Sequence, residues 1–187
     1  MDQDLKLPVE KRYVHGICTS ESDGSIVITA NAYLLSRIHH AASIYVDTTD
    51  GAMNEWELVI WDQMAQCGVF FLQYISCDNL SSVAMSIARV YSNRSDTPQY
   101  KKIFDEVQRI TLKATGRPLR LKRLSPGGTL ITVGVDMELA QVLGACESFF
   151  PTNNPGHSNI HVEHAHKLAP YFVRACYTHG KWYESLS

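Results

Sequence analysis

A long helix signal in the middle of the chain most limits how this sequence can fold. We predict a helix over residues 97–116, with Thr97 as its N-cap, Pro98 in its first turn and Gly116 as its stop. Strand-like segments stand before and after this helix, so the chain must cross over a sheet at this point. The apolar stripe of the helix comprises Tyr100, Ile103, Phe104, Val107 and Ile110.

The remaining segments alternate between strand-like and helix-like patterns. A strand at 25–29 is followed by a helix-like segment through Leu34, Leu35 and Ile38. Three strand candidates then follow in a row, and apolar and branched residues dominate them. They lie at 44–47, 56–62 and 69–76. Residues 79–91 favour a helix, because Leu80, Val83, Ala84, Ile87 and Tyr91 share one helical face. A buried strand ends at Asp136, a helix starts at once, and an apolar segment returns over 167–180.

This order predicts an α/β fold with a mixed sheet and helices on its faces. A ribonuclease-H-like fold fits the order well. A flavodoxin-like fold fits less well, because it would need a helix between the first strands. With 187 residues we expect a flexible tail at 1–12 and a single domain over 13–187.

Composition narrows the class of protein. A net charge of -2 gives no global attraction to nucleic acid or to an anionic membrane. No apolar run approaches the roughly 20 residues of a membrane span, and we expect no membrane partner. The polar start lacks the apolar core of a secretory signal. The five cysteines cannot all pair, so we expect reduced thiols in an intracellular protein, nuclear or cytoplasmic.

Two aspartates follow buried strand segments and are the candidate metal ligands. Asp47 closes the segment "SIYVD" and Asp136 closes "TLITVGVD". We predict that the two aspartates end neighbouring strands at the same edge of one mixed sheet. Their carboxylates then converge, and they repel each other unless a cation lies between them. Hard cations such as Mg²⁺ or Mn²⁺ prefer carboxylate oxygens and support phosphodiester chemistry. The alternative is structural, since Asp47 is a common turn residue and Asp136 an acceptable helix N-cap.

The sequence resembles the catalytic region of Mutator-like (MULE) transposases, especially the transposase-like proteins abundant in fungal genomes. The residues that carry the resemblance run along nearly the whole chain. They are "RYVHG", "LLSRIHHAASIYVDTT", "WELVIWD", "YKKIFDEVQRITLKATGRPLRLKRL", "VGVDMELAQVLG" and "VRACYTH". The resemblance implies a ribonuclease-H-like domain with an Asp, Asp, Glu metal-binding triad. Asp47 matches the first acid, Asp136 the second, and Cys176 with His179 the C-x2-H element that follows.

The third acid of that family lies well beyond the C-x2-H element, whereas this chain ends eight residues after His179. Glu184 is too close to be an obvious substitute, and Glu138 belongs to a different element. We therefore expect a domain truncated before its third catalytic acid. Whether it is an enzyme stays open at this point. One reading is a weak or vestigial metal-dependent nuclease or strand transferase, and the other is a catalytically silent binding or interaction module.

A histidine-rich stretch raises the alternative of structural zinc. His157, His161, His164 and His166 precede Cys176 and His179, which are also metal-ligand candidates. Imidazole and thiolate are good zinc ligands, although the spacing matches no standard zinc module. The other interpretation is a solvated loop beside a core cysteine.

A basic cluster is the candidate nucleic-acid contact. It comprises Lys113, Arg117, Arg120, Lys122 and Arg123, with no acid between Thr111 and Leu124. Such a cluster can follow a phosphate backbone, or it can be a solvated loop that balances acidic regions elsewhere. Tyr177, Trp182 and Tyr183 near the end could stack on bases or cover the core. That end could also be a docking surface for a protein partner or a second copy of the chain.

Overall fold

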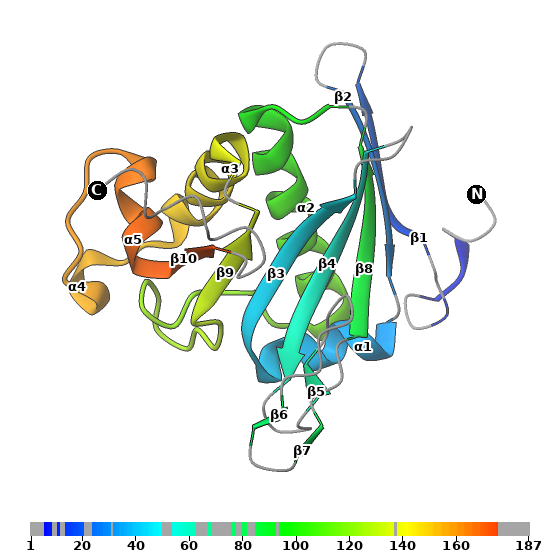
Figure 1. Ribbon diagram of the computed structural model, residues 1–187, viewed down its shortest axis with the longest axis horizontal. Coiled ribbons are helices and arrows are strands. Elements are labelled where there is room, and N and C mark those ends of the chain that lie inside the picture. Colours follow the sequence, from blue (N-terminus) through cyan, green and yellow to red (C-terminus); the bar gives the residue numbers. More distant parts are fainter. Residues whose placement is uncertain are drawn as a thin grey trace.

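The computed structural model describes residues 6–8, 11, 14–20, 24–30, 32–49, 54–62, 67–68, 76–77, 80–81, 85–92, 94–136 and 138–175. Within these residues the chain forms a mixed sheet with helices packed against it, which confirms the predicted α/β class (Figure 1).

The main sheet has the strand order β1-β2-β8-β4-β3-β9-β10. Pairing is antiparallel from β1 as far as β3, and parallel from β3 through β9 to β10. Because β4 runs opposite to both β8 and β3, the strands β8, β3, β9 and β10 all end at one edge of the sheet. The strands are β1 (Val14–Ser20), β2 (Gly24–Ala30), β3 (Ala41–Thr49), β4 (Asn54–Asp62), β8 (Met85–Ser92), β9 (Thr132–Val135) and β10 (Val173–Ala175).

Three short strands complete the described sheet structure. β5 (Cys67–Gly68) pairs with the end of β4, and β6 (Ser76–Cys77) pairs with β7 (Leu80–Ser81) in a separate ribbon. The helices connect the strands of the main sheet. They are α1 (Ala32–Arg37), η3 (Ile38–His40), α2 (Thr97–Thr115), α3 (Leu139–Phe149), η4 (Phe150–Thr152), α4 (Pro155–Ser158), η5 (Ala165–Leu168) and α5 (Ala169–Phe172).

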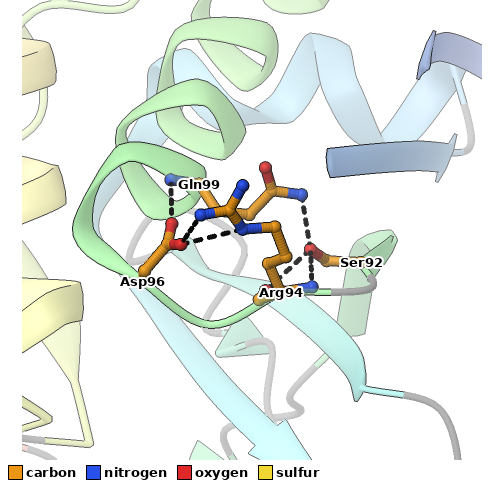
Figure 2. Close-up of polar contacts among 4 residues, drawn as sticks. All are labelled: Ser92, Arg94, Asp96 and Gln99. Atoms are coloured by element: carbon orange, nitrogen blue, oxygen red, sulfur yellow. Dashed lines mark hydrogen bonds and ion pairs between the residues drawn. The ribbon is translucent and has the colours of Figure 1, made fainter. Parts of the chain in front are cut away.

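The start of α2 is fixed by a hydrogen-bonded cap (Figure 2). Asp96 is the N-cap: its Oδ1 accepts from the Gln99 backbone N–H at 3.0 Å, and Arg94 pairs with its Oδ2. The Gln99 amide donates to Ser92 Oγ at 2.7 Å, which ties the helix to the end of β8. The predicted N-cap Thr97 is therefore wrong by one residue, while Pro98 in the first turn and Gly116 as a left-handed C-cap are confirmed.

The helix α2 buries its predicted stripe and packs closely on α3. All five stripe residues are buried. A Cβ at Gly144 of α3 would lie 2.4 Å from Tyr100 Cβ, so glycine is what allows the two helices to approach. Phe149 stacks edge-on against Phe172 with 5.6 Å between ring centroids, and so ties α5 to the same core.

The predicted helix over 79–91 is wrong, because residues 85–92 form strand β8 in the middle of the sheet. This strand pairs with β2 on one side and β4 on the other. Ala88, Val90 and Ser92 are buried on one face, and Ile87 is buried on the other. On that second face Arg89 is exposed and Tyr91 is half-buried. The apolar character of Ile87 and Tyr91 hides the alternation that would have identified the strand from its sequence.

Other strand boundaries also differ from the sequence-based prediction. β3 and β4 extend beyond the predicted 44–47 and 56–62 because each pairs along its full length with the other. β1 was not predicted at all, and it pairs with β2 as a hairpin. The predicted strand at 69–76 lies mostly outside the described residues.

Candidate acidic site at the ends of β3 and β9

The parallel pair β3–β9 brings the two predicted strand-end aspartates to neighbouring positions. The pairing matches Ser43 with Thr132 and Tyr45 with Gly134. A hydrogen bond of 2.6 Å between Ser43 Oγ and Thr132 Oγ1 fastens the same register. Continuing that register by two residues sets Asp47 opposite Asp136. The part of the prediction that concerns the strands is confirmed, because β3 and β9 are neighbours in one sheet.

Asp47 differs from the expectation in one respect. The strand continues through Thr49 rather than ending at Asp47, since Asp47 pairs with Glu57 and Thr49 with Glu55 of β4. Asp136 does follow the last residue of its strand, Val135. The side chain of Asp47 lies outside the described residues, so its position is defined by its backbone alone.

Asp136 is held by a buried glutamine at the start of α3. The residue is half-buried, and its Oδ1 atom is shielded from solvent. Its backbone N–H donates to Gln141 Oε1 at 3.1 Å. Gln141 is completely buried. The turn between β9 and α3 is therefore fixed by a side chain from the helix that it leads into.

A buried tyrosine extends this contact to a second carboxylate. Gln141 Nε2 donates to Tyr100 Oη at 3.4 Å, and Tyr100 Oη donates to Glu138 Oε2. Burial, together with the hydrogen bond and charge of Glu138 and the charge of Asp136, raises the pKa of Tyr100 above its ordinary value. The phenol thus stays protonated and acts as the donor to Glu138. Asp136, Glu138, Gln141 and Tyr100 form one polar network at the end of β9.

Sequence reasoning missed two members of this network. Tyr100 was correctly predicted as a core residue, but its hydroxyl also donates a hydrogen bond to Glu138 at the end of β9. Gln141 was not singled out. The available signal was an amide residue within the otherwise apolar run "LAQVLGA", five positions after Asp136.

Glu138 occupies the N-cap position of α3 without making a side-chain cap hydrogen bond. The structural alternative for Asp136, that it is the N-cap of this helix, is therefore wrong. Carboxylate oxygens here have the chemistry that Mg²⁺ or Mn²⁺ prefers, and the half-buried setting of Asp136 suits a ligand with restricted motion.

The residues proposed for zinc are not brought together in the described part of the chain. Cys176 and His179 lie outside the described residues, immediately after β10. His161, His164 and His166 are exposed, and the rings of His164 and His166 stack at 5.7 Å between centroids. No group of three or more His, Cys, Asp or Glu side chains that could hold a metal ion is found among the residues the structure describes.

The basic cluster lies at the opposite edge of the sheet from the acids. Lys113 is in the last turn of α2, and the segment from Arg117 to Arg123 leads toward the start of β9. The backbone N–H of Ile131 donates to the carbonyl of Ala42, near the start of β3. Asp136, in contrast, follows the end of β9. The structure thus separates the predicted nucleic-acid contact from the predicted metal site.

Comparison with protein-family models, with curated proteins and with solved structures gives no match to this chain. Among the described residues, no helix combines the length and the apolar character needed to cross a membrane.

Proposed function

We propose that this chain is a transposase-derived, ribonuclease-H-like domain whose Asp47 and Asp136 bind a divalent metal ion for phosphodiester chemistry on nucleic acid. The observation that carries the proposal is the parallel register of β3 and β9, which pairs Tyr45 with Gly134, each two residues before one of the aspartates. The resemblance of the sequence to Mutator-like transposases agrees with these positions.

The sheet order gives further support for the ribonuclease-H-like assignment. Three antiparallel strands in chain order, β3, β4 and β8, are followed by a helix, a parallel strand, a helix and a second parallel strand. The parallel strands add on the β3 side, so the first strand of the meander becomes central. This is the arrangement expected for that fold, extended here at the β8 edge by the β1–β2 hairpin.

The chain's own residues have distinct roles under this proposal. Asp47 and Asp136 would hold Mg²⁺ or Mn²⁺, which would supply activation of water and charge stabilisation at the phosphate. Gln141 fixes the backbone of Asp136, and Tyr100 fixes the side chain of Glu138. With two matched carboxylates we expect weak or absent cleavage, since small errors in positioning can lower the rate by about 100-fold.

A metal titration tests the proposal. The melting temperature of the wild-type protein is measured against Mn²⁺ concentration, beside Asp136→Asn and Asp47→Asn. A ligand present at about 100 times its Kd stabilises the folded state by about 2.7 kcal/mol. We expect an Mn²⁺-dependent rise in Tm in the wild type and loss of that rise in both variants.

Glu147→Gln provides the control, because Glu147 is an exposed acid on α3 and its loss changes the net charge equally. This variant should keep the wild-type response to Mn²⁺. An equal response in the wild type and in both aspartate variants would show that Asp47 and Asp136 do not bind the metal ion. Absence of an Mn²⁺ response in all four proteins would favour a binding or interaction module with no metal ion at these aspartates.

A further inference from the structure

We propose that the segment from Arg117 to Arg123 forms a binding surface for the phosphate backbone of duplex nucleic acid. Binding at this surface is independent of Asp47, of Asp136 and of any metal ion. The surface comprises Arg117, Arg120, Lys122 and Arg123. We call it the cationic segment. It stands apart from the metal site proposed above and does not depend on it.

The sequence "RPLRLKRL" alternates buried leucines with exposed cations from Leu119 to Lys122 and then turns, so that Lys122 and Arg123 are exposed next to each other. Leu119, Leu121 and Leu124 are almost completely buried in the core. Arg120 and Lys122, between them, are exposed. Leu121 forms a β-bridge with Leu130, and in a strand-like backbone neighbouring side chains point to opposite sides. The Leu121 carbonyl then accepts from the backbone N–H groups of Leu124 and Ser125, at 3.1 and 3.0 Å, which fixes the turn. The leucines therefore anchor the segment, and the cations face solvent from a fixed backbone.

The backbone of the segment is held by hydrogen bonds although it is not part of a named strand. The Lys122 N–H donates to Leu130 O at 2.7 Å, and Leu130 N–H donates to Arg120 O at 3.2 Å. A Cβ at Gly128 would lie 2.6 Å from the carbonyl carbon of Leu121, so glycine allows this close approach. The cations are thus displayed at defined spacing rather than on a free loop.

Contacts with the C-terminal part of the fold fix the far end of the segment. His157 Nε2 donates to the Lys122 carbonyl at 3.2 Å, since a carbonyl oxygen only accepts. The Arg123 guanidinium lies over the Tyr171 ring, 4.8 Å from its centroid. This contact orients Arg123 and leaves its charge intact.

The cationic segment keeps its charge uncompensated by ion pairs within the described part of the chain. The ion pairs recorded there join Arg94 to Asp96, Lys101 to Asp105 and Arg109 to Glu106. None of them involves the cationic segment, and the sequence from Arg117 to Val135 contains no acidic residue. A local positive field therefore exists on a chain whose net charge is negative.

Two features favour a duplex backbone as the occupant. Arg120, Lys122 and Arg123 are exposed within four consecutive positions, and a duplex carries one phosphate charge per about 1.7 Å of its axis, so a dense group of cations meets a dense row of anions. Tyr171 is half-buried, and the Arg123 guanidinium lies over its ring. The surface thus offers charge to phosphates and little opportunity for stacking on a base.

Position in the fold separates this surface from Asp136. The segment lies before β9 and Asp136 after it, so the four residues of β9 stand between them. At about 3.3 Å per residue this is about 13 Å. Figure 1 shows the loop before β9 and the start of α3 at opposite ends of that strand. Binding should therefore not require Asp136 or a divalent cation.

Fluorescence anisotropy with a labelled 20-base-pair DNA duplex, in EDTA and over a range of NaCl concentrations, tests the inference. The neutralised pair Arg120→Gln/Lys122→Gln is compared with Lys101→Gln/Arg109→Gln, which removes two α2 cations with the same change in net charge. Each phosphate contact contributes about 0.9 to the slope of log K against log salt concentration. We expect the first pair to reduce that slope by about two units and the α2 pair to leave it unchanged.

Further arms decide between this ligand and the alternatives. Asp136→Asn should bind the duplex as the wild type does, whatever the outcome of the Mn²⁺ titration. The conservative pair Arg120→Lys/Lys122→Arg should retain the wild-type slope. Equal losses in the cationic-segment pair and the α2 pair, or no binding at about 10⁻⁴ M protein in low salt, would overturn the proposal. Displacement of the duplex by polyglutamate at equal charge would instead identify an acidic protein as the ligand and contradict it.

Discussion

The ring of Tyr45 on β3 lies directly against the backbone of Gly134 on β9. A Cβ placed on Gly134 would be 2.1 Å from Tyr45 Cδ1, far inside any real contact distance. The two residues are also register partners in the parallel pair. The absence of a side chain at position 134 is thus what allows the tyrosine to lie across the strand two residues before the aspartates.

Gly134→Ala should destabilise the protein although alanine is usually the better residue in a strand. Forcing a methyl group into this contact should cost about 1–3 kcal/mol in the free energy of unfolding. Urea denaturation of the single variants and of Tyr45→Ala/Gly134→Ala measures the coupling. In the Tyr45→Ala background the substitution at position 134 should cost much less, and a strictly additive cycle would contradict the proposed contact.

Tyr100→Phe should lower stability by about 1–3 kcal/mol, because it removes the acceptor for Gln141 and the donor for Glu138. Thermal and urea unfolding measure the loss. Tyr171→Phe is the matched control, since it keeps the ring beneath Arg123 and has no recorded hydroxyl hydrogen bond among the described contacts. Equal effects in the two variants would show that the Tyr100 hydroxyl contributes nothing specific.

His39 should make stability depend on pH. Its Nε2 lies 2.8 Å from Thr115 Oγ1, and burial, the charge of Arg117 and the nearby His40 lower the pKa of His39. Because the folded state binds the proton less readily, stability is complete above about pH 6.5 and falls as pH drops from there toward the folded-state pKa.

His39→Gln removes this titration while keeping an amide donor near Thr115. Unfolding free energies of the two proteins are measured from pH 7.5 to 5.5. On acidification the wild type should lose stability relative to His39→Gln. The slope of this free-energy difference against pH should not exceed about 1.4 kcal/mol per pH unit. A difference that stays constant over this range would mean that the pKa of His39 is the same in the folded and unfolded states.

Cys146 should be inert in the native protein. It is completely buried in α3, and burial raises the pKa of its thiol to about 12. Thiolate is the reactive species, so iodoacetamide at pH 8 should not label this residue until the protein unfolds. Peptide mass spectrometry with and without urea checks this, and rapid native labelling at Cys146 would contradict its placement.

How far the sequence predicted the fold depended on how local each signal was. The helix α2 has a cap, a stripe and a stop within 20 residues of one another, and its extent was predicted almost fully. β8 was predicted as a helix because its identity depends on partners far away, Ile28 in β2 and Trp56 in β4, both of which pair with Val90. Ile87 and Tyr91 on the partly exposed face of β8 are apolar, which hid the alternation that a local pattern can detect.

The candidate site shows the same limit. The strand-then-acid pattern was enough to predict that Asp47 and Asp136 belong to neighbouring strands. It could not reveal that Gln141 and Tyr100 form hydrogen bonds beside Asp136 and Glu138. Tyr100 is separated from Gln141 by 41 residues, and the packing of α2 on α3 brings the two side chains together. The position of the cationic segment at the other edge likewise follows from chain direction, which composition does not record.

The late pairing of β3 with β9 affects how the chain can fold as it is synthesised. Val135 leaves the ribosome 86 residues after Thr49, counting from 49 to 135. At about 5–20 residues per second the exposed edge of β3 waits for about 4–17 s. During that interval β4 can cover one side of β3 while the other side is open to any extended chain nearby. This topology therefore leaves nascent β3 open to binding by a chaperone, or to misassembly with the same edge of a second nascent chain.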